Sequence, residues 1–239
     1  MKSLGNTKVT PAPEPFLIGT LAERSLHAHL KKVYTQPGDL VEEKLEGYWV
    51  DIRRGESVIE IQTGNFGNMK RKLAALLANR NVCVVHPVAV EKWITKLAKD
   101  GITFLSRRKS PKRGNLYDLF DELVSFPQLI LEPNFSVEVA LVKEEELRCE
   151  DGRGSWRRKG TSIKDHLLLE VVSRHHFSKP SDFLPLLPTR WKGPSTNREL
   201  SKALGQQYAR IARMTYCLVR MNLIRAVGKV GNSVLFELV

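Results

Sequence analysis

A tight turn at residues 54–56, Arg-Gly-Glu, most constrains how the N-terminal half of this chain folds. Residues 40–53 before the turn are rich in Val, Leu, Tyr and Trp, and a second extended segment, residues 57–63, follows it. Two extended segments joined by so short a connection pair as antiparallel strands. The sequence therefore predicts a β-hairpin, in which alternate side chains of each strand share one face of a sheet.

Helices and further strands are predicted on both sides of this hairpin. Residues 19–32 carry leucines at helical spacing, with Thr20 as the N-cap and Glu23 as its capping-box partner. The later segments predict a helix at 68–78, a strand at 82–86, a helix at 91–99, a strand at 101–105, a helix at 117–125 and a strand at 136–145. We therefore expect an α/β fold with a mixed sheet flanked by helices.

The charge of the chain indicates the class of its partner. Among 239 residues, 38 Lys and Arg stand against 26 Asp and Glu, which gives a formal net charge of +12. This excess favours a polyanion, and we expect DNA. The three cysteines show no metal-binding spacing, as is typical of a cytoplasmic protein. No stretch approaches the ~20 apolar residues of a membrane span, and residues 1–15 lack the apolar core of a secretory signal, so we expect no membrane partner.

Two carboxylates are predicted to meet on the hairpin. Asp51 ends the first strand, and Glu60 and Gln62 share one face of the second strand because side chains alternate along it. Two carboxylate oxygens with the backbone carbonyl of Ile61 would form a hard-oxygen site suited to Mg²⁺ or Mn²⁺. A metal ion there would support hydrolysis of a phosphodiester bond. No glycine loop of the GxGxxG or GxxxxGK[ST] type is present, so no nucleotide cofactor is expected.

This arrangement resembles the PD-(D/E)XK nuclease superfamily, which is restriction-endonuclease-like in fold. Its core is a helix, a hairpin carrying Asp and (Asp/Glu)-x-Lys, a second helix and a further strand, and the resemblance covers residues 17–105. It implies that Asp51 and Glu60 are metal ligands and that Gln62 stands in the place of the motif lysine. Glu23 matches an acidic residue that some members place near the metal, although capping alone would also explain it. The resemblance implies a bacterial or archaeal protein.

Gln62 is the main departure from the family pattern. A neutral amide cannot stabilise negative charge or donate a proton as lysine does. If the site is catalytic, Lys70 or Lys72 on the following helix, or Lys44 on the first strand, would have to supply the charge. The plainer alternative is that Asp51 is a hairpin residue and that Glu60 and Gln62 form the polar face of an edge strand.

The C-terminal segment resembles a winged helix over residues 165–239. Residues 196–205 predict a short capped helix that ends at a turn glycine, residues 207–222 a longer helix, and residues 223–238 a β-hairpin. The resemblance implies that the second helix exposes polar residues toward DNA and that the hairpin meets the DNA backbone. These residues are Gln206, Gln207, Arg210 and Arg213 on the helix and Lys229 on the hairpin. Because winged helices also mediate protein contacts, an adaptor role is an alternative.

Two basic segments are further candidates for DNA contact. The first, residues 106–114, would act as a phosphate clamp through Arg107, Arg108, Lys109, Lys112 and Arg113, or would simply be a solvated loop. The second is the glycine-rich loop 150–160. It contributes Arg157, Arg158 and Lys159, with Trp156 available to stack on a base or to pack at a hinge between domains.

The predicted organisation is a flexible tail (1–15), a nuclease-like domain (16–160) and a winged-helix domain (161–239) that contains a linker-like segment (180–194). The predicted function is metal-dependent endonucleolytic cleavage of DNA in repair, recombination or defence. The resemblance also suggests a homodimer. The alternative is a catalytically inactive DNA-binding protein or transcription regulator on a nuclease fold, which Gln62 would favour.

Overall fold

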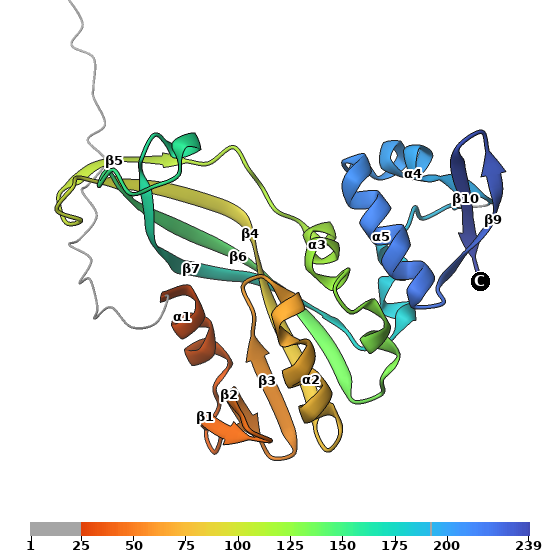
Figure 1. The fold of residues 1–239 in the computed structure, drawn as a ribbon, viewed down its shortest axis with the longest axis horizontal. Helices are drawn as coiled ribbons and strands as arrows, with labels where there is room; N and C mark the ends of the chain where they lie inside the picture. The colour runs from red at the N-terminus through yellow and green to blue at the C-terminus, as the bar shows by residue number, and fades with distance from the viewer. Residues whose placement is uncertain (1–24, 192) are drawn as a thin grey trace, which may run out of the picture.

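The computed structural model describes residues 25–191 and 193–239 (Figure 1). Its N-terminal part consists of α1 (Ser25–Tyr34), β1 (Leu40–Leu45), β2 (Tyr48–Arg54), β3 (Ser57–Ile61), η1 (Phe66–Met69), α2 (Lys70–Leu77) and β4 (Asn81–Leu97). The middle part consists of β5 (Phe104–Lys109), η2 (Leu116–Asp118), α3 (Leu119–Leu123), η3 (Pro127–Leu131), β6 (Phe135–Cys149), η4 (Trp156–Arg158) and β7 (Ser162–Phe177). The C-terminal part consists of η5 (Pro180–Leu186), β8 (Ser195–Thr196), α4 (Asn197–Leu204), α5 (Tyr208–Arg220), β9 (Ile224–Val230) and β10 (Ser233–Leu238).

Strands β1 to β7 form one mixed sheet in the order β1-β2-β3-β4-β6-β7, and β5 pairs with the far end of β4. The pairs β3–β4 and β4–β6 are parallel, whereas the other neighbours are antiparallel. Helix α1 packs on one face of the sheet over Ile59 and Ile61, and α2 and α3 pack on the other face over Val58 and Val84. The expected α/β architecture, a mixed sheet flanked by helices, is confirmed.

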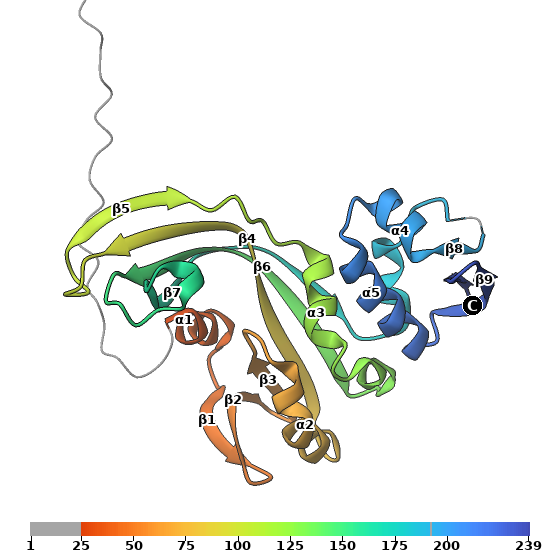
Figure 2. The same ribbon diagram turned by 45° about the horizontal axis from the view of Figure 1, so that its top comes forward.

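The strands β4, β6 and β7 run far beyond the helices and form a curved extension with β5 (Figure 2). We call this extension the arm. It comprises residues 91–97 of β4, all of β5, residues 143–149 of β6 and residues 162–170 of β7. Each residue of β5 is exposed. Strand β5 is therefore an exposed strand at the edge of the arm.

Three local predictions are corrected by the strand pairing. Residues 91–99, predicted as a helix, belong almost entirely to β4, because residues 93–97 pair with β5 on one side and β6 on the other. The segment 40–53 is two strands separated by a turn at Glu46-Gly47, where both residues have positive φ as a type I′ turn requires. Strand β5 begins later than predicted, so Arg107, Arg108 and Lys109 lie in a strand and not in a loop.

The proline-rich segment 180–194, predicted as a linker, is packed into the core. It forms η5, whose Phe183 is fully buried and stacks on Phe177 with ring centroids 4.6 Å apart. Leu186 and Leu187 join the same cluster as Ile130 and Phe135 of the large sheet region. This segment therefore fixes the C-terminal part to the sheet and does not separate two mobile units.

The C-terminal elements form a helical pair and a small three-stranded sheet in the order β8-β10-β9. The predicted capped helix is confirmed, because Thr196 and Glu199 form a reciprocal capping box at the start of α4 and Gly205 ends it with positive φ. Helix α5 buries Ile211 and Leu218 in the same cluster as the residues of α3. The predicted boundary at residue 161 lies too early, since β7 pairs with β6 as far as Phe177. Among the described helices, none combines the length and apolar character needed to cross a lipid bilayer.

We expect replacement of Phe183 by Ala to lower the free energy of unfolding by roughly 3–5 kcal/mol, because it removes a buried aromatic ring at the junction of the sheet and the C-terminal part. Chemical denaturation of the whole chain measures the loss. The control is Leu184→Ala at an exposed neighbouring position, for which the change should stay within about 0.5 kcal/mol. An equally small loss for both variants would show that the segment is not part of the core.

Candidate functional site

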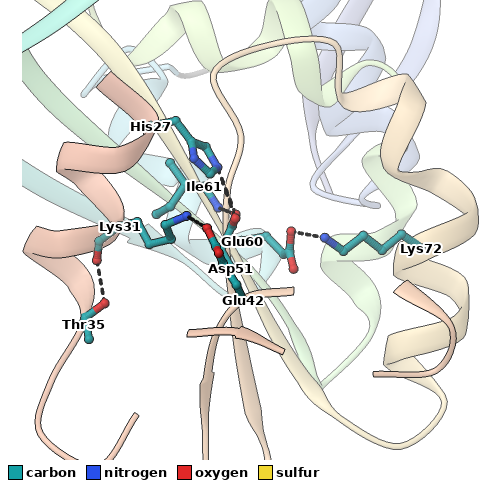
Figure 3. A network of polar contacts seen from close by, with 8 residues as sticks. All are labelled: His27, Lys31, Thr35, Glu42, Asp51, Glu60, Ile61 and Lys72. Carbon is teal, nitrogen blue, oxygen red and sulfur yellow. Dashed lines mark hydrogen bonds and ion pairs between the residues drawn. The ribbon is translucent and has the colours of Figure 1, made fainter. Parts of the chain in front are cut away.

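Asp51 and Glu60 lie on neighbouring strands where β2 and β3 separate, with the Asp51 carboxylate directed toward His27 of α1 and the Glu60 carboxylate toward Lys72 of α2 (Figure 3). Ile52 pairs with Ile59, so Asp51 and Glu60 are the next opposed residues on the two antiparallel strands. Regular backbone pairing stops there, and the backbone N–H of Ile61 donates instead to the Asp51 carboxylate at 2.8 Å. The structure therefore places the two predicted carboxylates at neighbouring positions of the hairpin, where each contacts a different helix.

Glu42 of β1 lies opposite Asp51 of β2. The pairing passes from Val41 opposite Ile52 to Glu43 opposite Val50, so one residue of each strand lies between these pairs and the register is kept. Glu42 has a φ of 55°. Lys31 of α1 binds Glu42 at 2.5 Å, which ties this position of β1 to the helix.

The Asp51 carboxylate is held in its ionised form by its neighbours. His27 Nε2 on α1 lies 3.2 Å from it, and the Ile61 N–H completes its contacts. Burial by itself would raise the pKa of Asp51, but the hydrogen bond and charge of His27, together with the Ile61 N–H, lower that pKa below its usual value. Asp51 also borders an open pocket of about 350 Å³ that Lys31, Trp49 and Val50 line. The carboxylate is therefore both charged and accessible.

The Glu60 carboxylate lies in a different environment, since only 3% of this residue is exposed. Its Oε2 accepts a hydrogen bond from Lys72 of α2, whereas its Oε1 is buried and has no hydrogen-bond partner. Burial and the charge of Asp51 raise the pKa of Glu60 from its usual 4.5 to about 7, although Lys72 opposes that rise. Glu60 thus carries an unsatisfied oxygen toward which a cation would be attracted.

The lysine that reaches this pair is Lys72. It lies at the third position of α2, whereas Lys70 at the first position is exposed and Lys44 lies exposed on β1. The side chain of Gln62, which stands in the motif position, turns away and donates to the backbone carbonyl of Gly64. The described contact of Ile61 is through its N–H and not through the carbonyl that was expected as a metal ligand. Glu23 lies outside the described residues.

His27 is a member of the site that the sequence pattern did not identify. On sequence grounds, His27 and His29 are expected to have no role beyond the first helix, and the structure corrects this for His27. The available signal was helical spacing, because His27 and Lys31 follow the buried Leu26 and Leu30 on α1. Spacing alone does not say which strand such a face meets.

The two carboxylates fit a hard divalent cation as a partial ligand set. No group of three or more His, Cys, Asp or Glu suited to a metal ion occurs within residues 25–191 and 193–239. Magnesium sites of enzymes that act on phosphates commonly use one or two carboxylates and complete the shell with water and phosphate oxygens. The unpartnered Oε1 of Glu60 beside the ionised Asp51 meets that requirement.

The cations predicted to clamp phosphate on the first basic segment divide into two groups. Arg107 binds Glu145 through two hydrogen bonds of 3.0 and 3.2 Å and lies over the ring of Trp93, and Lys109 pairs with Glu91. Those two side chains are already compensated by carboxylates. The others, Arg108, Lys112 and Arg113, are exposed, and no carboxylate pairs with them in the described part of the chain.

The predicted exposed face of α5 is partly occupied. Arg210 binds Asp118 at 2.6 Å and Asp121 at 3.1 Å, and Arg213 binds Asp121 at 2.7 Å. The expectation that Arg210 lies on an open surface is therefore wrong, because the acidic start of α3 packs against it. Gln206 also turns inward, since its side-chain oxygen accepts from Asn115. Two further predicted contacts of the C-terminal part, Gln207 and Lys229, are exposed. In the loop at the end of the arm, Trp156, Arg157 and Lys159 are exposed and Arg158 is half-buried.

Comparison with known proteins identifies relatives of the large sheet region. The family model described as Domain of unknown function (DUF8091) matches residues 24–178. A protein of Treponema pallidum (strain Nichols), named "Uncharacterized protein", is 33% identical over 172 residues, which are 71% of this chain and 68% of that relative. No solved structure matches the chain. The family match ends directly after β7, so it includes the candidate site and the arm and excludes α4 and α5.

We expect the stability of the wild type, relative to Glu60→Gln, to decrease as the pH rises. The native state keeps a proton on Glu60 up to a pH of about 7, whereas the unfolded chain loses it near 4.5, so the native state binds more protons in that window. The stability that the proton on Glu60 gives the wild type is complete below pH 4.5. It is lost as the pH rises through about 7, and the free energy of unfolding relative to Glu60→Gln falls by about 1–3 kcal/mol.

Urea denaturation of both proteins at several pH values measures this difference. The control is Glu132→Gln at an exposed position, whose difference from the wild type should not vary with pH. A constant difference for Glu60→Gln as well would mean that Glu60 is ionised throughout.

Proposed function

The chain belongs to the DUF8091 family, and we propose that it hydrolyses phosphodiester bonds of DNA with a divalent metal ion bound by Asp51 and Glu60. The observation that carries the proposal is the pair of opposed carboxylates, one of which has a buried oxygen without a partner, with Lys72 beside them. A second support is the order of elements, since α1, the β2–β3 hairpin, α2 and β4 follow the order of the PD-(D/E)XK core.

Each residue of the site would have a distinct task. A bound divalent ion would lower the pKa of a water molecule and stabilise charge on the scissile phosphate. His27 and the Ile61 N–H orient Asp51 and keep it ionised. Lys72 would supply the positive charge that Gln62 lacks. If Glu60 held a metal ion, the ammonium group of Lys72 would be available to a phosphate oxygen. The pocket beside Asp51 gives solvent a path to the site.

The C-terminal elements would provide DNA binding as a winged helix. Helices α4 and α5 followed by the β9–β10 hairpin support that assignment, as do the exposed Gln207 and Lys229. In the described conformation Asp118 and Asp121 occupy Arg210 and Arg213. Those carboxylates would compete with DNA phosphates for the same cations.

We expect Asp51→Asn and Glu60→Gln to abolish Mg²⁺- or Mn²⁺-dependent cleavage of a panel of labelled duplex, single-stranded and branched DNA. Lys72→Ala should lower the cleavage rate by about 100-fold, because it removes a charge that stabilises the transition state. Gel analysis of the products measures the rates. The control is Arg71→Ala, which removes an exposed cation from the same helix and should leave the rate unchanged.

The internal pairs of Asp51 with His27 and of Glu60 with Lys72 favour a second function, DNA binding without cleavage. In that case the pairs would have replaced the metal. Tight DNA binding by the wild type with no cleavage under any metal condition, and binding unchanged in both carboxylate variants, would decide for this alternative.

We expect the double variant Asp118→Asn/Asp121→Asn to bind a labelled DNA duplex about 3–10-fold more tightly, because it releases Arg210 and Arg213 from α3. Fluorescence anisotropy at fixed salt measures the affinity. The control is Glu46→Gln/Glu132→Gln, which changes the net charge equally at exposed positions. An equal gain in both double variants would indicate a general charge effect and no competition on α5.

A further inference from the structure

The tip of the arm carries a second polar pocket, far from the carboxylate pair. It has a volume of about 470 Å³ and lies between the ends of β4 and β6 and the loop of residues 150–161. We call it the tip pocket. Its charged lining consists of the cations Lys96, Arg148, Arg157, Arg158 and Lys159 and the single carboxylate Glu150.

The positive charge of the tip pocket is only partly compensated. Lys96 pairs with Glu150 at 3.0 Å, and Arg148 pairs with Glu146 at 2.5 Å. Within the described residues, no carboxylate is recorded in an ion pair with the three cations of the loop, Arg157, Arg158 and Lys159. Uncompensated cations gathered around a concave surface favour an anionic ligand.

The loop is a compact structure and not a flexible run of charge. A Cβ added to Gly154 would lie 1.8 Å from the carbonyl oxygen of Thr161, so the two sides of the loop are in direct contact. Asp151 binds the backbone N–H of Arg153 at the base of the loop, and it also binds Ser162 and Lys164 on β7. These contacts fix the backbone of the loop that carries the pocket cations.

An exposed aromatic ring lies next to the pocket. Trp156 is 82% exposed, so it does not pack at a hinge between domains. The guanidinium group of Arg157, which lines the pocket, lies over the Trp156 ring at 5.5 Å. A free indole face beside a basic pocket matches the two parts of a nucleotide, the base and its phosphate.

We propose that the tip pocket binds a phosphate of a single-stranded DNA segment and that Trp156 stacks on the adjoining base. The segment must be unpaired because a base within a duplex stacks on its neighbours and offers no free face. The choice of DNA rests on the proposed function. The inference deepens that function by naming the substrate class, a duplex with an unpaired end.

The arm connects the tip pocket to the carboxylate pair. Glu60 pairs with Val84 of β4, and Lys96 lies twelve residues further along the same strand. At about 3.3 Å per residue this path is at most about 40 Å, close to the length of roughly 12 base pairs. On the arm, Glu146 pairs with both Lys92 and Arg148. Figure 2 shows α1, which carries His27, beneath the arch of the arm. An unpaired end at the tip would thus leave duplex DNA along the arm.

The experiment measures binding by the whole chain in EDTA, so that no cleavage occurs. Fluorescence anisotropy compares a blunt duplex with duplexes that carry a DNA overhang, an abasic overhang or an RNA overhang. Arg157→Ala/Lys159→Ala should weaken binding of the DNA overhang at least tenfold and reduce the salt slope by about 0.7, because one phosphate contact is lost. Trp156→Ala should weaken it about fivefold to 100-fold, and Trp156→Phe should restore most of the affinity.

The controls separate this inference from general charge and from catalysis. Lys179→Ala/Arg190→Ala removes two exposed cations away from the arm and should leave overhang binding unchanged. Trp156→Ala should have no effect with the abasic overhang. The inference is overturned if the Trp156 and Arg157/Lys159 variants bind the DNA overhang like the wild type. It is also overturned if they lose affinity for the blunt duplex and the overhang duplex equally. Tighter binding of the RNA overhang overturns the assignment to DNA. Because binding is measured without metal, failure of cleavage would contradict only the proposed function.

Discussion

The pairing of β4 with three other strands is the constraint on which the rest of the structure depends. Its first residues lie between β3 and β6, and its last residues lie between β5 and β6. One strand therefore joins the helix-covered sheet, where the carboxylates lie, to the arm. Parallel pairing on both sides buries Val82, Val84 and Val85 completely or almost completely.

Buried charge distinguishes the two regions along this strand. In the candidate site, Glu60 keeps one oxygen without a partner, although Lys72 is close to the other. On the arm, the consecutive residues Glu144, Glu145 and Glu146 are all buried, but cations from neighbouring strands pair with each of them. A satisfied buried carboxylate is explained by structure alone, whereas an unsatisfied one has a cost that a ligand would remove. This contrast is the physical reason for placing the chemistry at Asp51 and Glu60.

The C-terminal part packs into the hydrophobic core, and ion pairs at the edge of this contact cover part of the surface of α5. Phe183 and Ile211 share a cluster with residues of α3, while Asp118 and Asp121 of η2 and α3 hold Arg210. Apolar burial sets the position of α5, and the ion pairs then form at the edge of that contact. The family match ends at residue 178, before α4 and α5.

The sequence by itself determined the hairpin at residues 54–56, the neighbouring positions of Asp51 and Glu60, and the capped helix α4. Turn residues 54–56 predicted the hairpin, and alternation placed Asp51 and Glu60 at opposed positions; the capped helix at Thr196 followed from its own side chains. Only the tertiary structure decided which partners these residues have. Local preference predicted a helix at residues 91–99. The prediction is wrong because the hydrogen bonds of this strand come from β5 and β6, distant segments that no local pattern encodes. The approach of His27 to Asp51 and of Arg210 to Asp118 likewise depends on which faces pack together, and helical spacing identifies a face without identifying what it meets.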